Sequence, residues 1–442
     1  MKTNLIHKNI AILGFGKEGE STLRFLQKNG ILDGSVTILD KNLNLKISNF
    51  DGKVIVGENY LNDLEKYDYI FKSPGISLYT NNLLYLKDKI LTQTKLFFEF
   101  YKGKIISITQ TKGKSTTATL VYQLLKNAGY NAKLVGNIGN PVLDEIDIEK
   151  DNYDFVVYEL SSYMLEDLEN HHSFISILGN IFPDHLDWHL NFENYSKAKK
   201  NILKNSDNIL VGLGLYPKIE KELLNRKFLT FGPKDGYISH FDNSFFINGE
   251  KIDIKVNPKI PGEHNLNNFC SILATAHIIG IDYNIFEKTI NEFEGLPHRL
   301  QNIGNYKGIT FIDDAISTTP ESTIEGIKSF NGLVQTIYLG GTDRGYDFKN
   351  LVKILEQYNI KNIVLFPDSG KRIKKLLRKA NYNILETKNM KEAVIFSFKN
   401  TQAGKICLLS NAGPSYSLWK NFGEKGDEFK QEILNQYKNL EQ

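Results

Sequence analysis

The segment Thr109–Thr117, which reads Thr-Gln-Thr-Lys-Gly-Lys-Ser-Thr-Thr, has the residue types of a phosphate-binding loop. It follows an apolar run, Lys104–Ile108, that predicts a buried strand, and it leads into an amphipathic pattern over Ser115–Ala128 that predicts a helix. Between a strand and a helix, Gly-Lys-Ser places backbone N–H groups and the positive end of the helix dipole against phosphates. The ammonium of Lys114 would neutralise those phosphates.

A hydroxyl in the same loop would complete a nucleotide site, because the loop hydroxyl of such sites reaches the Mg²⁺ that accompanies ATP. The residues predicted to contact the nucleotide here are Thr111, Lys112, Gly113, Lys114, Ser115 and Thr116, and the hydroxyl would come from Ser115 or Thr116. The general motif has a glycine where this chain has Ile108. A plain strand–turn–helix therefore remains an alternative for this stretch taken alone.

Acidic and imidazole side chains follow two further predicted strands. Glu159 ends the strand Phe155–Glu159, and the strand Ser173–Gly179 runs into a loop with four candidate side chains, Asp184, His185, Asp187 and His189. Open α/β sheets bind ligands beyond the carboxyl ends of their strands, so both groups are expected near the phosphate loop. Glu159 with a loop hydroxyl suits Mg²⁺, and the lack of a nearby cysteine argues against zinc. A lone histidine is more often structural, but this cluster favours chemistry.

A second glycine-rich turn lies near the start of the chain. The predicted strand Asn9–Leu13 runs into Gly14–Gly19, and the next predicted strand, Val36–Asp40, ends in an acid about 20 residues further on, as in the dinucleotide-binding fingerprint. The glycines let a pyrophosphate approach the helix N-terminus, and Asp40 can bind a ribose hydroxyl. The residues predicted to line this site are Gly14, Phe15, Gly16, Lys17, Asp40, Lys41, Ser73, Pro74 and Gly75. A dehydrogenase site and a turn without a ligand are the alternatives.

Strand and helix patterns alternate along the chain and predict an α/β fold with parallel sheets. Further strands are predicted at Tyr69–Lys72, Thr336–Leu339, Asn362–Phe366 and Lys405–Ser410, and further helices at Glu18–Asn29 and Asn350–Tyr358. The turn-rich segment Phe228–Pro258 predicts small antiparallel strands. Seams near residues 101–103 and 295–298 predict three domains: a Rossmann-like domain over 1–101, a central P-loop ATPase-type domain over 102–298 and a Rossmann-like α/β domain over 299–442.

Composition excludes several classes of function. Hydrophobic residues make up 41% of the 442 residues, and the net charge of +3 is too small and too dispersed to indicate a nucleic-acid partner. No apolar run approaches the ~20 residues of a membrane span, and the first residues show no signal-peptide pattern. Cys270 and Cys407 lie in apolar runs, which predicts buried free thiols. We therefore expect a monomeric cytoplasmic enzyme that acts on small molecules.

In chain order, these motifs resemble the Mur ligase family. The family shares a T-G-T-x-G-K-S-T loop, a glutamate after a strand and an N-I-x-x-D-H-L-D-x-H loop, which correspond here to Thr109–Thr117, Glu159 and Asn180–His189. The next motif, Y-x-x-A-K, corresponds to Tyr195–Lys199. The family's lysine at this position is carbamylated, so the resemblance implies a carbamate on Lys199. Without the motif, Lys199 would be interpreted as a solvated lysine of a lysine-rich helix.

Further motifs extend the resemblance over essentially the whole chain. They are Val135–Gly139, Gly262–Asn268, Gly295–Arg299, Asp313–Pro320, Leu409–Ser415 and Lys420–Phe422, and the last two resemble the branch of the family that adds D-glutamate. The D-N-P-R motif of the branch that adds meso-diaminopimelate is missing. The resemblance implies that the muramoyl substrate meets Asn137 and Ser161, that ATP meets Asn265, Asn268, Arg299 and Asp314, and that the amino acid meets Thr318, Arg344, Ser415 and Phe422.

The resemblance implies an ATP-dependent ligase that joins D-glutamate to UDP-N-acetylmuramoyl-L-alanine in peptidoglycan synthesis. The substrate carboxylate would take the γ-phosphoryl group of ATP, and the amine of glutamate would attack the acyl phosphate. The implied catalytic residues are Lys114, Glu159, His185 and carbamylated Lys199, the last three holding two Mg²⁺ with Ser115 or Thr116. Closure of the third domain is expected to exclude water from the intermediate.

Four residues depart from the family pattern. Gln110 replaces a glycine, Lys112 an asparagine, and Ile316 and Arg344 each a lysine. These changes leave the identity and the stereochemistry of the amino acid open, with L-glutamate as the alternative. A folylpolyglutamate synthase is a related alternative, which the Rossmann-like first domain disfavours. A dehydrogenase leaves the phosphate loop unexplained, and a non-catalytic nucleotide-binding regulator is the alternative that Gln110 and Ile316 favour.

Overall fold

The computed structural model describes Leu5 and residues 7–31, 35–137, 140–148, 150–168, 171–242, 244–260, 262–377 and 382–441. The chain forms two compact units, Met1–Phe293 and Glu294–Gln442. Ile138 and Gly139 of the predicted glycine-asparagine motif, and Asn243 of the turn-rich segment, lie outside the described residues. The predicted boundaries of three domains stay a prediction.

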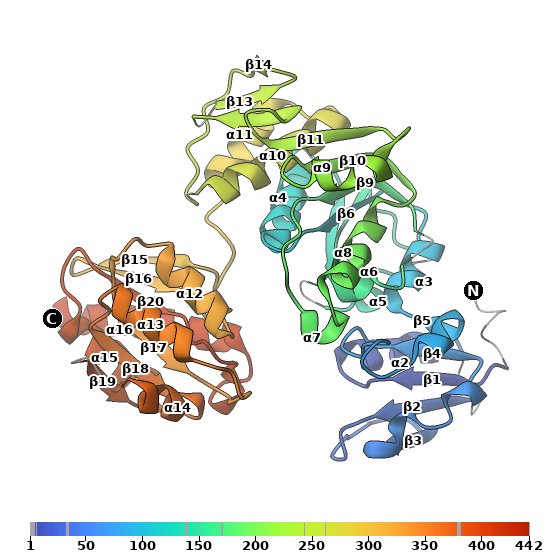
Figure 1. Ribbon diagram of the computed structural model, residues 1–442, viewed down its shortest axis with the longest axis horizontal. Coiled ribbons are helices and arrows are strands. Elements are labelled where there is room, and N and C mark those ends of the chain that lie inside the picture. Colours follow the sequence, from blue (N-terminus) through green and yellow to red (C-terminus); the bar gives the residue numbers. More distant parts are fainter. Residues whose placement is uncertain are drawn as a thin grey trace. The chain divides into compact units, whose positions relative to one another are not determined.

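The first sheet of the first unit is parallel throughout, with the strand order β3-β2-β1-β4-β5 (Figure 1). Its elements are β1 (Ile10–Leu13), α2 (Lys17–Lys28), β2 (Val36–Asp40), β3 (Lys53–Val56), β4 (Tyr69–Lys72) and β5 (Ile90–Leu91). The central strands are buried on both faces, which is why they appear in the sequence as continuous apolar runs. The helix α2 covers one face through Leu23 and Leu26. The carboxyl ends of β1, β2 and β4 carry the predicted first site.

The second sheet of this unit has nine strands in the order β14-β13-β12-β11-β10-β9-β6-β8-β7. They are β6 (Ile105–Thr109), β7 (Ala132–Gly136), β8 (Phe155–Glu159), β9 (Ser173–Leu178), β10 (Ser206–Gly212), β11 (Phe228–Pro233), β12 (Ile238–Phe241), β13 (Ser244–Ile247) and β14 (Glu250–Lys251). The antiparallel prediction for Phe228–Pro258 is right for β12–β14. It is wrong for β11, which pairs in parallel with β10 because the connection between them is long enough to return the chain to the same end.

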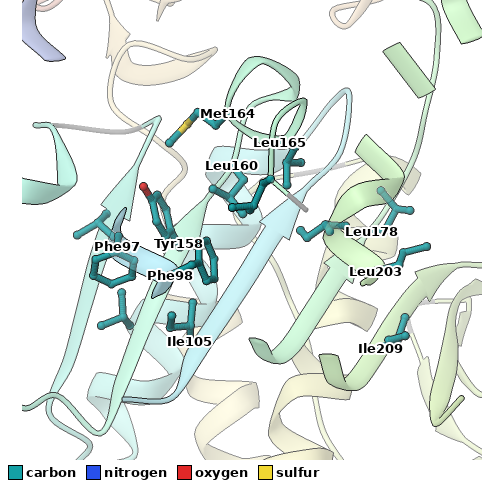
Figure 2. Packing of buried hydrophobic residues seen from close by; sticks show 14 of the residues in the cluster. Phe97, Phe98, Ile105, Tyr158, Leu160, Met164, Leu165, Leu178, Leu203 and Ile209 are labelled. Carbon is teal, nitrogen blue, oxygen red and sulfur yellow. The ribbon is translucent and has the colours of Figure 1, made fainter. Parts of the chain in front are cut away.

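Helices cover both faces of the nine-stranded sheet. They are α3 (Gln93–Phe100), α4 (Lys114–Asn127), α5 (Val142–Glu145), α6 (Ser162–Leu165), α7 (Leu186–His189), α8 (Phe192–Lys200), α9 (Tyr216–Ile219), α10 (Glu263–Ile279) and α11 (Tyr283–Glu292). On one face α4 packs against α10 and α11. On the other, Phe97 and Phe98 of α3 pack on Tyr158 of β8, with ring centroids 5.3 and 5.6 Å apart (Figure 2). This core fixes β6, β8 and β9, whose carboxyl ends carry the predicted catalytic residues.

The second unit contains a six-stranded sheet in the order β15-β16-β20-β17-β18-β19 (Figure 1). Its elements are β15 (Gln301–Tyr306), β16 (Ile309–Asp313), α12 (Pro320–Lys328), β17 (Val334–Gly340), α13 (Lys349–Gln357), β18 (Asn362–Phe366), α14 (Ser369–Leu376), β19 (Asn383–Glu386), α15 (Met390–Asn400), β20 (Ile406–Leu409) and α16 (Phe422–Glu441). The β15–β16 pair is antiparallel and the remaining pairs are parallel.

Separate apolar cores lie on the two faces of this sheet, one under α12, α13 and α14 and the other under α15 and α16. The predicted α/β class with parallel sheets is confirmed. Cys270 and Cys407 are buried free thiols, as predicted. Within the described ranges, no helix combines the length and the apolar character that crossing a membrane requires.

Candidate functional site

The phosphate loop connects β6 to α4, and its backbone needs a glycine. Gly113 has a φ of 95°, and a Cβ added there would lie 2.6 Å from Nε2 of Gln110 and 2.8 Å from Oδ1 of Asn268. The ammonium of Lys114 folds back on the loop, donating to the backbone carbonyl of Gln110 over 2.9 Å. Ser115 and Thr116 occupy the first turn of α4, where the helix dipole favours an anion.

Gln110 fits at the position of the family's glycine because of two features elsewhere in the chain. Its Nε2 donates to Oγ1 of Thr117 over 3.0 Å and to Oδ1 of Asn268 over 3.1 Å. Its Oε1 lies where Gly179 has no side chain, since a Cβ on Gly179 would come within 1.7 Å of it. Gln110 thus ties the phosphate loop to α10, whose first turns carry the predicted nucleotide contacts Asn265 and Asn268.

Asn180, which the sequence analysis did not single out, holds the phosphate loop from the other side. Its Oδ1 accepts from the amide of Lys112 and its Nδ2 donates to the carbonyl of the same residue, both over 3.0 Å. Its own carbonyl accepts from the amide of Thr111 over 2.9 Å. The hydroxyl of Thr111 bonds that of Tyr195 over 2.8 Å. The available signal was the position of Asn180 at the start of the loop that carries His185.

Glu159 has the environment of a ligand for a cation. It ends β8, where its Cα pairs with that of Ile108 at the entrance to the phosphate loop, and it is fully buried. Its Oε1 accepts from Nδ2 of Asn137 over 3.2 Å, while its Oε2 is buried and has no hydrogen-bond partner among the residues that the structure describes. A buried carboxylate oxygen without a partner is costly unless a cation meets it. This donor fits Mg²⁺, which takes oxygen ligands.

Lys199 is almost completely buried, with 1% of its surface exposed. The interpretation as a solvated helix lysine is therefore wrong, although its neighbour Lys197 on α8 is exposed. Its Nζ donates to Oγ1 of Thr109 over 3.0 Å and to the carbonyl of Gln110 over 3.1 Å. Burial and the nearby ammonium of Lys114 lower the pKa of Lys199 well below its ordinary value. A neutral amine is the form that reacts with carbon dioxide.

The two histidines of the loop after β9 differ in environment. His185 is half exposed. Its partial burial lowers its pKa, although the negative charge of Asp184 acts in the opposite direction and raises it. His189 is buried, and its Nε2 lies 3.0 Å from the hydroxyl oxygen of Ser162. Burial lowers the pKa of His189 to about 4. His185 can therefore reach a ligand, whereas His189 supports the loop. Among the described residues, no group of three or more His, Cys, Asp and Glu side chains gathers around one point.

The predicted first site forms a cavity of about 390 Å³ in the first unit. Its lining is Gly14, Gly16, Lys17, Glu18, Asp40, Lys41, Tyr60, Ser73, Pro74, Gly75 and Ile76. The side chain of Phe15 is instead buried in the core, and its amide donates to Oδ2 of Asp40 over 2.6 Å. Asp40 thereby also fixes the glycine turn. The sequence analysis missed Tyr60, which lies outside every motif.

Two further predicted substrate contacts, Asn137 and Ser161, follow the phosphate loop in the chain. Asn137 follows β7 and donates to Glu159. Ser161 is buried and caps α6, where its hydroxyl accepts from the amide of Met164 over 3.3 Å. Both side chains are thus held near the carboxyl ends of strands, as expected for ligand contacts in this type of sheet.

In the second unit, the predicted nucleotide contact Asp314 is held by hydrogen bonds. Asp314 is buried. Its carboxylate accepts hydrogen bonds from the hydroxyl of Ser410 over 2.7 Å and from the amide of Leu300 over 3.3 Å. Burial raises the pKa of its carboxyl to about 6. Arg299 is exposed. Its neighbour in the chain, His298, has its Nδ1 2.7 Å from Oδ2 of Asp313.

The predicted amino-acid contacts of the second unit differ in exposure. Ser415 is buried and its hydroxyl has no hydrogen-bond partner in the described structure. Phe422 is 39% exposed and its ring lies 6.1 Å from that of His298. Thr318 is half-buried and Arg344 is exposed. The sequence analysis missed Lys425, whose fully buried ammonium also lacks a partner there and whose pKa burial lowers to about 7.

Sequence comparisons agree on one family. A profile described as the Mur ligase middle domain matches residues 108–276. The UDP-N-acetylmuramoylalanine–D-glutamate ligase of Streptococcus mutans serotype c is 33% identical over 445 aligned residues, which cover 96% of this chain and 97% of that protein. The ligase of the same name from Streptococcus agalactiae serotype III is 32% identical, and the alignment covers 97% of each chain.

A solved structure has the same overall fold. The MurF ligase from Thermotoga maritima in complex with ADP has a TM-score of 0.58 to this chain at 16% identity, and the match covers 99% of this chain and 97% of that one. At this identity the likeness concerns the fold, and it confirms the α/β architecture.

Proposed function

Because the chain belongs to the Mur ligase family, as an ATP-dependent amino-acid ligase, we propose that it joins D-glutamate to UDP-N-acetylmuramoyl-L-alanine. The observation that supports this chemistry is the presence of two unusual buried groups beside the phosphate loop. These are the amine of Lys199 on the loop carbonyl and the unpartnered Oε2 of Glu159. A purely structural strand–turn–helix needs neither of them.

We assign the cavity of the first unit to the UDP-linked substrate. Gly14 has a φ of 86°, and a Cβ on Gly19 would lie 2.3 Å from the carbonyl oxygen of Gly14, so this turn holds the backbone close to the helix N-terminus. That geometry suits a diphosphate. Lys17 and Lys41 line the same cavity and add positive charge.

We assign the metal sites to oxygen and imidazole donors around the phosphate loop. The proposed ligands are a hydroxyl of Ser115 or Thr116, the carboxylate of Glu159, the imidazole of His185 and a carbamate on Lys199. Mg²⁺ bound there would neutralise charge on the transferring phosphoryl group. The carbamate supplies oxygen donors, which an ammonium cannot, and this explains the use of a lysine.

The proposed reaction has two steps. A carboxylate oxygen of the substrate attacks the γ-phosphorus of ATP and ADP leaves, and the amine of D-glutamate then attacks the acyl carbon so that phosphate leaves as the amide forms. Lys114 stabilises charge on the transferring group, and its position depends on a loop that Gln110 and Asn180 hold rigid. Rigid positioning of this kind is worth several kcal/mol in phosphoryl transfer, about 10²-fold or more in rate.

We propose that Thr318, Arg344, Ser415 and Phe422 bind the incoming amino acid. The exposed guanidinium of Arg344 and the unpartnered hydroxyl of Ser415 are suited to the carboxylates of glutamate. The family often has a lysine at the position of Arg344. Because a planar guanidinium binds a carboxylate in a different geometry from an ammonium, L-glutamate or another acidic amino acid is the second candidate substrate. We further propose that the enzyme works as a monomer in the cytoplasm, where ATP is available.

One experiment tests the proposal directly. Phosphate release is measured with ATP, Mg²⁺ and UDP-N-acetylmuramoyl-L-alanine against D-glutamate, L-glutamate and other amino acids. Release that depends on both the UDP-linked substrate and D-glutamate supports the proposal. Phosphate release with L-glutamate but not with D-glutamate would show that L-glutamate is the substrate. No phosphate release with either amino acid would reject the proposed ligase reaction with these substrates.

A further inference from the structure

We propose that Trp188 is a positioning residue that couples the substrate cavity of the first unit to His185. This inference rests on the proposed function, because it assumes that the UDP-linked substrate occupies the cavity and that His185 serves the reaction. Trp188 is not itself one of the residues that line the cavity. Its contacts instead join the loop that forms one wall of the cavity to the loop that carries His185.

On one side, Trp188 is bound to the segment Ser73–Ser77, here called the cavity loop. Its indole Nε1 donates to the carbonyl of Gly75 over 3.3 Å. Its own backbone carbonyl accepts from the hydroxyl of Ser77 over 2.8 Å. Ser73 to Ile76 line the cavity, so the bond to Gly75 links Trp188 to the cavity wall and the bond from Ser77 links it to the residue that follows the wall.

A buried cation strengthens this connection. The ammonium of Lys72 lies 5.6 Å from the centroid of the Trp188 ring, a distance at which the ring attracts a positive charge. The same ammonium donates to the carbonyl of Ile76 over 3.0 Å and lies 3.8 Å from Oδ2 of Asp167. Lys72 therefore holds the indole and the cavity loop together.

On the other side, Trp188 packs against the rings that surround His185. Its ring centroid lies 4.7 Å from that of Tyr163, which lies 5.0 Å from the ring of His185. It also lies 4.5 Å from the ring of His189, which bonds Ser162. A displacement of the indole would therefore be passed to His185 through packed rings.

The short helix α7 is anchored by its buried residues. It spans Leu186–His189, and its buried residues are Trp188 and His189. The residues on either side, His185 and Leu190, have left-handed backbones with φ of 53° and 68°. Such backbone conformations are unfavourable for residues other than glycine, and they persist only where surrounding contacts hold them. Trp188 supplies two such contacts with the cavity loop, and His189 supplies another with Ser162.

The coupling has a direct spectroscopic test, because Trp188 and Trp419 are the two tryptophans of the chain. In the Trp419→Phe variant, the fluorescence reports on Trp188 alone. Titration with UDP-N-acetylmuramoyl-L-alanine, without ATP or Mg²⁺, should shift the emission of Trp188 along the binding curve measured by calorimetry. Binding by calorimetry with no change in emission would overturn the inference. If Trp419→Phe does not fold, the difference between wild-type and Trp188→Phe spectra gives the same signal.

Kinetics supplies the second readout. Trp188→Phe keeps a ring but loses the indole N–H, and Ser77→Ala removes the bond to the backbone of Trp188. Both should lower kcat about 10-fold while the KM for D-glutamate stays within about twofold, and Trp188→Ala should be worse than Trp188→Phe. Trp419→Phe is the matched control, with kcat near the wild-type value.

The outcomes separate the two proposals. An inactive wild-type enzyme in the phosphate-release assay would reject the proposed function. An active wild-type enzyme with unchanged kcat in both Trp188→Phe and Ser77→Ala would reject the role of Trp188 alone. Unchanged thermal melting of the variants, together with reduced kcat, would show that the effect is positional rather than a loss of folding.

Discussion

The ammonium nitrogen of Lys199 lies 3.0 Å from the hydroxyl oxygen of Thr109, the last residue of the strand that enters the phosphate loop. A lysine buried in this way has little water to solvate its charge, and the nearby ammonium of Lys114 lowers its pKa further. The neutral amine is therefore favoured, and it is the form that can carry a carbamate. The position next to the loop explains why a modified lysine would serve the reaction.

We predict that Lys199→Ala has little activity and that small carboxylates, such as formate or acetate, partly restore it by supplying the missing oxygen atoms. Phosphate release measures both effects. Lys197→Ala, two residues away on the exposed side of the same helix, is the control and should keep wild-type activity. A ¹³C signal of a carbamate in enzyme equilibrated with labelled bicarbonate would be lost in Lys199→Ala, and its absence from the wild type would contradict the prediction.

Lys114→Ala should abolish ligation and leave binding of the UDP-linked substrate nearly intact, because the substrate cavity and the phosphate loop are built on different sheets. Loss of a group that neutralises phosphate costs several kcal/mol at the transition state, about 10²-fold or more in kcat. Calorimetry with the UDP-linked substrate measures the binding. Lys126→Ala, in the last turn of the same helix, should behave as wild type. Wild-type turnover in Lys114→Ala would refute the phosphate-loop assignment.

Gln110 and Gly179 should behave as a pair. Gly179→Ala would place a methyl group within 1.7 Å of Oε1 of Gln110, so the single variant should lose stability, by about 1–3 kcal/mol. Gln110→Gly removes the obstructing side chain, and the double variant should recover most of that loss. Denaturant unfolding of the four proteins measures the coupling. Additive losses would show that the two residues do not contact each other in solution.

Glu18 should make stability depend on pH. Burial raises the pKa of its carboxyl from 4.5 to about 7, so between these values the folded chain holds a proton that the unfolded chain has lost. Stability from this group therefore falls as the pH rises from about 4.5 to about 7. Glu18→Gln removes the ionisation, and its advantage over the wild type should grow by roughly 1–3 kcal/mol between about pH 5 and pH 8. Glu20→Gln, exposed on the same helix, should show no such trend in urea unfolding.

Arg344→Ala should raise the KM for glutamate far more than the KM for ATP, because the lost contact is mainly one of binding. Arg344→Lys should keep substantial activity if the pocket is an ordinary D-glutamate pocket. Steady-state kinetics with glutamate and with ATP as the varied substrate measures these effects. The control is Lys349→Ala, because Lys349 is an exposed cation nearby in the sequence. If the lysine variant is as damaged as the alanine variant, the pocket depends on the guanidinium fork. If neither variant changes the KM for glutamate, the pocket lies elsewhere.

Local sequence was sufficient for the elements and for most residues that line the cavity of the first unit. Strands β2, β4, β8 and β18 begin and end at the predicted residues, and other predicted ends differ by one or two residues. Buried parallel strands are continuous apolar runs, and this signal depends on neighbouring residues alone. The glycine turn and the acid of Asp40 line one cavity, as predicted, because consecutive parallel strands bring their carboxyl ends to one edge.

The contacts that give the site its particular properties depend on tertiary structure. Gln110 and Asn268 are 158 positions apart, and Trp188 and Gly75 are 113 apart. No local spacing encodes such pairs, because each depends on how separate segments pack. The burial of Lys199 beside an exposed Lys197 was hidden for the same reason, since only the folded core removes one of them from water. The sequence by itself determined the α/β fold and the strand–loop–helix unit around Thr109–Thr117, through apolar periodicity and the backbone freedom of glycine. The tertiary structure decided which charges are buried and which loops are joined, because these follow from close packing between distant parts of the chain.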